Sequence, residues 1–123
     1  MTQTTDRPQR PTTFTSDRPW GAFEQLSLNQ RSTVKIITVE PGSRLSLQRH
    51  EHRSEFWQLL DGPMDIEVGA DSWTAQSGEH IWVPAGSTHR MGNSGQRSAR
   101  VLEIALGDFD EEDIERLEDD YDR

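Results

Sequence analysis

The order of hydrophobic and polar residues indicates a chain built mainly of short β-strands. A β-branched run at Val34–Glu40, VKIITVE, has strand length, and MDIEV at Met64–Val68 alternates apolar with acidic residues. Glycine and proline separate such segments, as at Pro41-Gly42 and Asp61-Gly62-Pro63, where we expect turns. Short strands at regular intervals with turns between them are typical of an antiparallel sandwich or barrel, so the predicted fold class is all-β. Further strands are expected at Phe23–Leu28, Arg44–His52, Glu55–Leu59, Trp73–Ala75, His80–Val83, Thr88–Gly92 and Arg100–Leu106.

The C-terminal segment has a different, helical pattern. Asp110 has the residue type of a helix N-cap, and the acidic residues directly after it suit the positive end of a helix dipole. Ile114, Leu117 and Tyr121 follow at the spacing of one helix face. We therefore expect a short amphipathic helix at the C-terminus, packed on the barrel.

The N-terminal stretch is polar and rich in proline. Residues 1–17 lack the basic start and apolar core of a secretory signal, and we expect a flexible arm there. The sequence Arg18-Pro19-Trp20-Gly21 predicts a turn, because proline fixes its own backbone and restricts the residue before it. At 123 residues the chain has room for one domain, which we place at residues 18–123.

Composition excludes several classes of function. The chain has no cysteine, which excludes disulfides and thiolate metal sites and fits a cytoplasmic location, and it has no apolar run of membrane-spanning length. Ten acidic and two basic residues between Asp108 and Arg123 carry −8 of the net charge of −9. Without a basic stripe, nucleic acid is not an expected partner. A local basic pocket for a small phosphorylated ligand stays open, with Arg18, Lys35, Arg53 and Arg90 as candidates.

Potential metal ligands are concentrated in one short stretch. Gln48, His50 and His52 have the same parity, so an extended strand would present them on one face, about 7 Å apart. Glu55 follows a predicted turn, and His89 lies in a distant segment. Imidazole nitrogens and carboxylates are ligands of Zn, Mn, Fe, Ni and Co, whereas a glutamine oxygen is a weaker one. We predict that the two segments meet and hold one divalent metal ion, with zinc the first choice.

Both segments carry spaced motifs. The pattern G-x5-P-x-G-x2-H-x3-N is met in full by Gly78, Pro84, Gly86, His89 and Asn93. Its companion, G-x5-H-x-H-x3,4-E-x6-G, is nearly met: Gly42 is two residues further from His50, and Glu55 one residue closer to His52. Together they resemble the two cupin motifs, which implies a jelly-roll barrel.

A narrower resemblance extends from about residue 18 to the end. The Q-x-H-x-H-R-x-E-x-W run at Gln48–Trp57, RPWG at Arg18–Gly21 and the C-terminal segment resemble the cupin domain of type II mannose-6-phosphate isomerases. In that family the domain is commonly the C-terminal part of a bifunctional protein with mannose-1-phosphate guanylyltransferase. The resemblance implies a metal-dependent isomerase of mannose 6-phosphate and fructose 6-phosphate. It also implies a homodimer that pairs through a sheet edge.

The resemblance implies roles for individual residues. The family pattern suggests Gln48, His50, Glu55 and His89 as metal ligands, whereas ordinary cupin usage favours His52 over Gln48. Arg53 matches an arginine that the family implicates in isomerisation. Glu103, His52 or a metal-bound hydroxide would be the base, and Arg18, Lys35 or Arg90 would hold the phosphate. Trp57 is a candidate for contact with substrate, although the four tryptophans are more typical of a core.

The chain also departs from the family. Phe56 occupies a position where histidine is usual, and no glycine-rich phosphate loop is present, so guanylyltransferase activity is not expected. One alternative is a non-catalytic domain that binds a sugar or nucleotide sugar, as a partner of a separate guanylyltransferase. Another is a different metal-dependent cupin enzyme, such as an oxygenase, with which two histidines and one glutamate are compatible.

Overall fold

The structure, a computed structural model, describes residues 14–121, and all regular elements in this range are β-strands. Strands at most of the predicted positions confirm the all-β prediction, with ends displaced by a few residues. The strands are β1 (Phe14–Arg18), β2 (Gly21–Gln25), β3 (Ser32–Val39), β4 (Leu47–Arg49), β5 (Arg53–Asp61), β6 (Met64–Val68), β7 (Asp71–Ala75), β8 (His80–Val83), β9 (His89–Gly92), β10 (Ala99–Gly107) and β11 (Glu115–Glu118).

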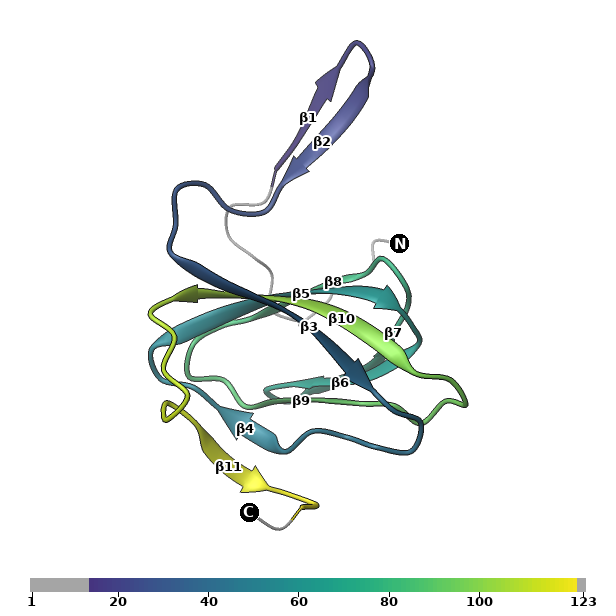
Figure 1. Cartoon of the computed structure of the whole chain (residues 1–123), viewed down its shortest axis with the longest axis vertical. Coiled ribbons are helices and arrows are strands. Elements are labelled where there is room, and N and C mark those ends of the chain that lie inside the picture. Colours follow the sequence, from purple (N-terminus) through teal and green to yellow (C-terminus); the bar gives the residue numbers. More distant parts are fainter. Residues whose placement is uncertain (1–13, 122–123) are drawn as a thin grey trace.

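Two antiparallel sheets face each other and form a jelly-roll barrel (Figure 1). One sheet has the order β3-β10-β5-β8, and the other has the order β11-β4-β9-β6-β7. The strands alternate apolar and polar positions, so each sheet turns one set of side chains toward the other. The main core therefore lies between the sheets and includes Trp57, Leu59 and Val101 from one, and Ile66 and Met91 from the other.

Strand β5 shows how this alternation positions functional residues. Glu55, Trp57 and Leu59 are buried on its inner face. Phe56 points the other way, into a second apolar cluster with Ile104. An inward carboxylate is thus fixed by the same two-residue period that fixes the core.

The first ligand-bearing strand is shorter than predicted. Only Leu47–Arg49 pairs as β4, and residues 50–52 form a turn before β5 begins at Arg53. Upstream, Arg44 makes a single bridge to Gly92. The expected shared face from Gln48 to His52 therefore ends at His50, because a turn does not keep the parity of a strand.

The predicted C-terminal helix is wrong. Residues 108–114 form an irregular segment, and Glu115–Glu118 forms β11, which pairs antiparallel with β4. The Asp113 carboxylate accepts hydrogen bonds from the backbone N–H groups of Glu51 and His52. Isolated helices of this length are marginal, whereas a strand here pairs the exposed edge of β4.

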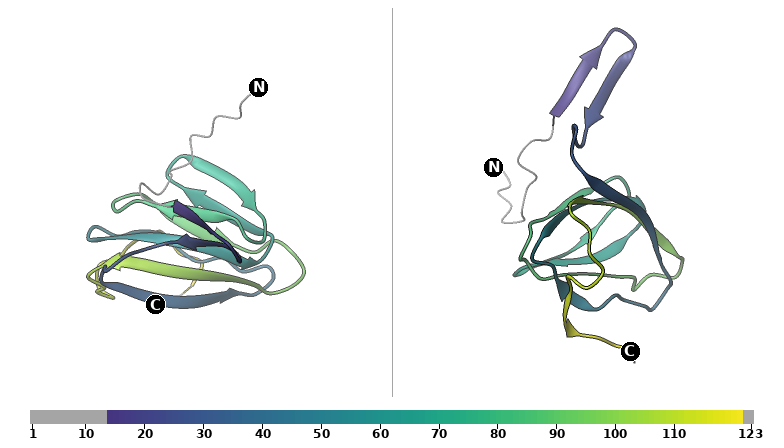
Figure 2. Two further views of the ribbon diagram at one scale, coloured as in Figure 1. Left: turned by 90° about the horizontal axis from the view of Figure 1, so that it is seen from above. Right: turned by 60° about the vertical axis from the view of Figure 1, so that its left-hand side comes forward.

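The predicted N-terminal arm, residues 1–17, overlaps the first strand of the structure. Residues 1–13 of the predicted arm lie outside the described residues, whereas residues 14–17 belong to β1. Strands β1 and β2 form a hairpin whose register pairs Arg18 with Gly21, so Pro19-Trp20 is the turn, as predicted. This hairpin extends away from the barrel (Figures 1 and 2). Trp20, at 73% exposure, is therefore not a core residue. No helix in the described range has the length and apolar character needed to cross a membrane.

Candidate functional site

Three potential metal ligands converge inside the barrel. His50 lies just after β4, Glu55 on β5 and His89 at the start of β9, and ligand atoms of all three lie within 4.8 Å of one another. All three side chains are buried. The Gly86 N–H donates to the His50 carbonyl at 2.7 Å, and Gln48 is the cross-strand partner of His89, which ties the two motif segments together. Gly86 has φ = 86°, a left-handed turn conformation that favours glycine.

Both histidines are oriented by backbone carbonyls. Nδ1 of His50 lies 2.7 Å from the Asp113 carbonyl oxygen, and Nδ1 of His89 lies 3.1 Å from that of Ser87. Each Nδ1 therefore carries the hydrogen and donates it, which leaves the Nε2 lone pairs directed at Glu55, at 3.4 and 3.8 Å. Burial is the largest cause that lowers the pKa of His89 and favours the neutral ring.

This donor set fits a divalent cation. The Nε2 atoms of His50 and His89 both face the Glu55 carboxylate, an arrangement that a divalent cation between them stabilises. The carbonyl partners of Nδ1 are the type of outer contact that fixes the tautomer of metal-binding histidines. His50, Glu55 and His89 can therefore hold one metal ion.

Arg53 supplies positive charge beside these ligands. Its Nε donates to Glu55 Oε2 at 3.2 Å, and its Nη2 lies 3.1 Å from Nε2 of His50. Nη1 donates to the Asp110 carbonyl at 3.1 Å, and the guanidinium carbon lies 4.2 Å from the centroid of the Phe109 ring. The C-terminal segment thus holds a buried cation at the ligand cluster.

A second carboxyl, Glu103, lies against Glu55. Burial, followed by the charge and hydrogen bonding of Glu55, raises the pKa of Glu103 to about 8. Burial alone would also raise the pKa of Glu55, but the attraction of the His89 and His50 rings when they are protonated, and a 2.9 Å hydrogen bond from Trp57 Nε1, bring it below its ordinary value. The pair therefore consists of an ionised Glu55 and a protonated Glu103 near neutral pH, and Glu103 holds a proton that it can exchange.

These groups surround a cavity of about 220 Å³. Lys35 lies at its edge, 4.3 Å from the Phe109 ring centroid and 3.6 Å from Glu111. Phe109 was not singled out by the sequence, since nothing in its neighbourhood signals contact with β3 or β5. The residues that line the cavity include the candidate ligands His50, Glu55 and His89 together with Gln48; the charged Lys35, Arg53 and Glu103; Trp57; and Phe109, Glu111, Ile114 and Arg116 from the C-terminal segment.

Other predicted site residues lie elsewhere. His52 is exposed in the turn after β4 and is not part of the ligand group. Arg18 lies on the hairpin, with its guanidinium over the Phe23 ring. Arg90 borders the cavity, but its guanidinium donates to the Leu45 carbonyl and to Glu118. The structure therefore brings Lys35 and Arg53, but not Arg18 or His52, to the ligand cluster.

The departure at Phe56 leaves the cavity unchanged. Its side chain lies on the outer face of β5, where it packs against Ile104 and Leu106 and meets the His80 ring edge-on at 5.0 Å. The polar group expected at this position from the family pattern would point away from the ligands.

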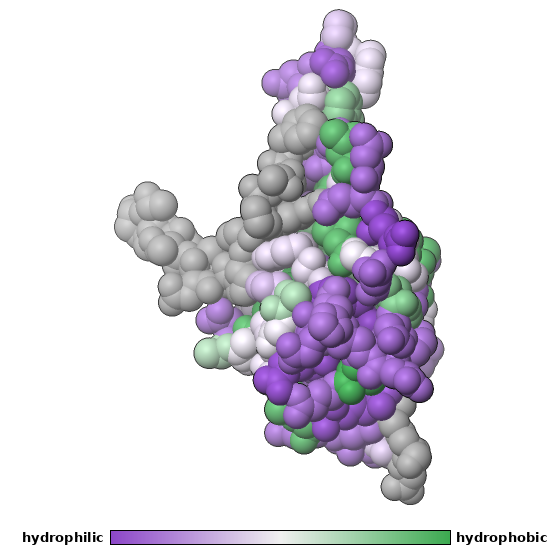
Figure 3. Space-filling model, turned by 90° about the vertical axis from the view of Figure 1, so that its left-hand side faces the viewer, coloured by the Kyte–Doolittle hydropathy of each residue, from purple (hydrophilic) through white to green (hydrophobic). Residues whose placement is uncertain are grey.

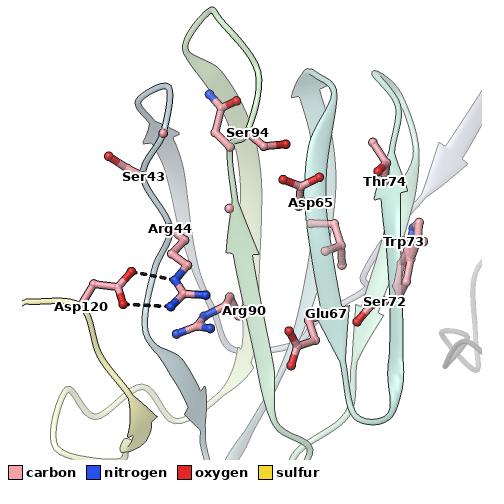
Figure 4. Close-up of a pocket in the computed structure, with 14 residues that line it drawn as sticks. Ser43, Arg44, Asp65, Glu67, Ser72, Trp73, Thr74, Arg90, Ser94 and Asp120 are labelled. Carbon is pink, nitrogen blue, oxygen red and sulfur yellow. Dashed lines mark hydrogen bonds and ion pairs between the residues drawn. The ribbon is translucent and has the colours of Figure 1, made fainter.

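A larger hollow of about 540 Å³ lies on the outer face of the five-stranded sheet (Figure 4). Asp120 binds the Arg44 guanidinium through both carboxylate oxygens, at 2.7 and 3.0 Å. The charges of Arg44 and Arg90 are thus already paired, and no group of metal ligands lies there among the described residues. We therefore assign the functional site to the inner cavity.

Comparison with protein families gives one match. The family described as mannose-6-phosphate isomerase C-terminal matches residues 5–119. Over 107 residues, or 86% of this chain, the sequence is 39% identical to the xanthan biosynthesis protein XanB of Xanthomonas campestris and 38% identical to the alginate biosynthesis protein AlgA of Pseudomonas aeruginosa. It is 36% identical over the same length to a mannose-1-phosphate guanylyltransferase of Escherichia coli. These matches cover only 22–23% of each relative's length.

Solved structures support the fold. The capsular polysaccharide assembling protein CapF of Staphylococcus aureus superposes with a TM-score of 0.66 at 19% identity, over 87% of this chain and 34% of that chain. A sugar phosphate isomerase of the cupin superfamily from Silicibacter pomeroyi superposes with a TM-score of 0.58 at 24% identity, over 66% of this chain and 53% of that chain. At these identities the comparison establishes the cupin fold alone.

Proposed function

Because this chain belongs to the family of mannose-6-phosphate isomerase C-terminal domains, we propose that it interconverts mannose 6-phosphate and fructose 6-phosphate with the help of one divalent metal ion. The observation that carries the proposal is the convergence of His50, Glu55 and His89 with Glu103 and Arg53 in one cavity. A cavity of about 220 Å³ is smaller than the roughly 300–1,000 Å³ of pockets for drug-sized ligands, which favours a small substrate.

In this proposal His50, Glu55 and His89 hold the metal, and Gln48 is the fourth protein ligand. Gln48 lines the same cavity opposite His89, whereas His52 does not. The set suits zinc first, and also manganese, cobalt, nickel or iron. Such an ion, when bound, polarises the sugar oxygens and stabilises the negative charge of the enediolate.

Glu103 is the group that we assign to proton transfer. The reaction moves a proton between C1 and C2 of the sugar, so one side chain must accept it from one carbon and return it to the other. A carboxyl with a pKa of about 8 is ionised in a fraction of the molecules near neutral pH, and this carboxylate form accepts the proton from one carbon and returns it to the other. Trp57 keeps Glu55 in place by its hydrogen bond and closes the inner wall of the cavity.

Lys35 and Arg53 are the cations that we assign to the anionic substrate. Both border the cavity and both lie on the Phe109 ring, so they are held next to each other before substrate arrives. Arg53 also contacts Glu55 and the His50 ring, two of the proposed metal ligands, whereas Lys35 contacts Phe109 and Glu111 at the edge of the cavity. We therefore assign the phosphate to Lys35 and the sugar oxygens to Arg53.

The test is an isomerase assay on the purified protein. Turnover of mannose 6-phosphate is measured after chelation and after addition of zinc, manganese or cobalt, with elemental analysis of the same samples. We expect activity that follows metal content, is lost in His89→Ala, and is retained in His80→Ala. The fourth histidine, His80, packs on Phe56 outside the cavity and is the matched control.

Absence of turnover above the His89→Ala background with every metal would contradict isomerisation. Saturable binding of a sugar phosphate or nucleotide sugar without turnover would support a second candidate, a non-catalytic domain that acts with a separate guanylyltransferase. This candidate is favoured by relatives that are named guanylyltransferases and are more than four times as long as the matched region. Iron-dependent uptake of dioxygen would point instead to an oxygenase.

A further inference from the structure

Strand β11 brings one more cation to the wall of the inner cavity. Arg116 lines this cavity, although it belongs to neither of the spaced histidine motifs. Its cross-strand partner on β4 is Gln48, and Gln48 in turn pairs with His89 on β9. Residues directly opposite each other on antiparallel strands present their side chains on the same face of the sheet. Arg116, Gln48 and His89 therefore form one row on the inner face of the five-stranded sheet.

The neighbouring pair of the same two strands points the other way. Glu115 is opposite Arg49, and the two side chains form an ion pair. Directly after Arg116 the register shifts, so that Leu117 is an extra residue of β11. A bulge of this kind commonly redirects a side chain next to a site. The alternation along β11 thus separates an outward Glu115 from an inward Arg116.

The Arg116 guanidinium has no ion-pair or hydrogen-bond partner among residues 14–121. The other three lysine and arginine side chains of the cavity wall each have a carboxylate no more than 3.6 Å away. These pairs are Lys35 with Glu111, Arg53 with Glu55, and Arg90 with Glu118. Arg116 is therefore the cation of this wall whose hydrogen-bond donors are all available to a ligand.

A phosphate group suits these donors. Guanidinium has five N–H donors in a planar arrangement that matches two oxygens of one phosphate, whereas an ammonium group acts as a point charge. Lys35 lies on β3 of the four-stranded sheet, and Arg116 lies on β11 of the sheet that faces it. The cavity between them has a volume of about 220 Å³, which is small enough for long side chains from both walls to contact one phosphate.

The charge of the C-terminal segment agrees with this role. Residues 108–123 carry ten acidic and two basic residues, and Arg116 is the basic residue in the described part, 108–121. The segment crosses from β10 to β11 at one end of the barrel (Figure 1). Figure 3 looks onto this end, and the lower part of the view is mostly hydrophilic. The acidic segment thus places its positive charge at the cavity, where it offsets the repulsion of an approaching anion.

We propose that Arg116 binds the phosphate of the substrate from β11, opposite Lys35, and so restricts the site to phosphorylated sugars. A neutral hexose would leave the guanidinium without a partner. The inference rests on the proposed function for the identity of the substrate, but it concerns binding and not turnover.

The test is isothermal titration calorimetry of the zinc-loaded full chain with mannose 6-phosphate and with inorganic phosphate. We expect Arg116→Gln to raise the Kd of both anions about tenfold or more, because charge-assisted hydrogen bonds are lost. Arg116→Lys should raise it only about threefold, since the charge remains but the two-oxygen contact does not. Arg97→Gln is the matched control, because it removes the charge of an exposed arginine outside the cavity, and it should keep the wild-type Kd.

Further measurements separate binding from a structural role of Arg116. In Arg116→Gln the zinc affinity and the unfolding temperature by circular dichroism should stay at the wild-type values. Where turnover is measurable, KM should rise while kcat stays within about twofold. If Arg116→Gln does not fold, Arg116→Lys decides, and an unchanged Kd in that variant overturns the inference.

The outcomes also separate this inference from isomerisation. Equal Kd values in Arg116→Gln and Arg97→Gln overturn the role of Arg116, even if the wild type is an active isomerase. Anion binding that Arg116→Gln weakens supports this role, even if the wild type shows no turnover. A wild type that binds neither anion overturns both.

Discussion

At the scale of single residues, Glu55 connects the groups of the site. It faces His50 and His89, accepts hydrogen bonds from Arg53 and Trp57, and shares a hydrogen bond with Glu103. The spacing of histidines and glutamate predicted that His50, Glu55 and His89 meet. The contact with Glu103 depends on the register of β10 against β5, which sequence spacing does not encode.

The protonated state of Glu103 leads to a prediction for the chelated protein. Its pKa of about 8 lies above the ordinary carboxyl range, mainly because burial disfavours the charged form. The folded state therefore binds this proton more tightly than the unfolded chain, and the stabilisation is lost as pH rises through about 8. Glu103→Gln should remove this loss, since an amide keeps a hydrogen-bond donor for Glu55 without a charge.

The measurement is the unfolding temperature of chelated protein between about pH 6 and pH 9. We expect a steeper fall for the wild type than for Glu103→Gln. Glu111→Gln, which removes an exposed carboxylate at the edge of the same cavity, should follow the wild type. Parallel curves for wild type and Glu103→Gln would show that Glu103 is already ionised at neutral pH.

Phe109 leads to a second prediction at this scale. Its ring contacts both Lys35 and Arg53, and each cation–π contact at a partly exposed site is worth about 0.5–1 kcal/mol. Phe109→Leu keeps apolar bulk but removes the ring, so we expect mannose 6-phosphate to bind roughly 5- to 30-fold more weakly, as about 1–2 kcal/mol implies.

Isothermal titration calorimetry with mannose 6-phosphate measures this effect. Phe23→Leu is the matched control, because Phe23 also lies under a guanidinium, that of Arg18, but on the hairpin. Equal affinities in Phe109→Leu and Phe23→Leu would show that the ring does not position the two cations.

At the scale of elements, the C-terminal segment shows why the local sequence pattern predicted a helix where the structure has a strand. Ile114, Leu117 and Tyr121 have helical spacing, but the contacts that decide the conformation are distant in sequence. The Asp113 carboxylate accepts hydrogen bonds from two backbone N–H groups in the turn after β4, and β11 pairs with β4. Asp110, which was predicted to be a helix N-cap, instead lies in a local turn, where its Oδ1 accepts a hydrogen bond from the backbone N–H of Glu112. Tertiary pairing thus overrides a weak propensity for helix.

Asp113 leads to a prediction about the anchoring of this element. The backbone N–H groups of Glu51 and His52 hold the pKa of Asp113 below its ordinary value. Its stabilising contribution is therefore present above the ordinary pKa and is lost as pH falls through the lowered one. In Asp113→Asn, one acceptor becomes an amide nitrogen, so we expect faster hydrogen exchange at Glu51 and His52 already at neutral pH.

Hydrogen exchange resolved to these amides tests the anchor. The control is Asp110→Asn, which alters only a turn within the segment and should leave exchange at Glu51 and His52 unchanged. Wild-type exchange rates in Asp113→Asn would mean that β11 alone holds the segment on the barrel.

At the scale of the whole molecule, the sequence predicted the barrel better than its attachments. Alternation along Met64–Val68 and glycine-proline turns define strands locally, and the spaced motifs bring His89 to His50. The sequence did not predict the cavity wall formed by residues 109–116, nor the projecting hairpin. The positions of both depend on which strand edges and sheet faces the rest of the barrel leaves exposed. The barrel is therefore encoded by local periodicity, whereas the site also requires a segment from outside its motifs.

This division leads to a prediction that separates fold from site. Every residue of the main core lies between Val39 and Val101, so a chain that ends after Gly107 keeps that core and both facing sheets except β11. It loses the Asp113 carbonyl that orients His50 and the Asp110 carbonyl that binds Arg53. We expect this chain to retain its β-sheet circular dichroism but to bind zinc about 10- to 100-fold more weakly, as is typical when outer contacts of metal-binding histidines are removed. A chain that ends after Glu118 is the control, since it keeps β11 and the Asp110 and Asp113 carbonyls while it loses the Arg44–Asp120 pair and the Tyr121 hydrogen bond to Arg44, and it should keep wild-type zinc affinity. Wild-type affinity in the shorter chain would mean that the barrel alone orients the histidines, and failure to fold would mean that the C-terminal segment belongs to the fold as much as to the site.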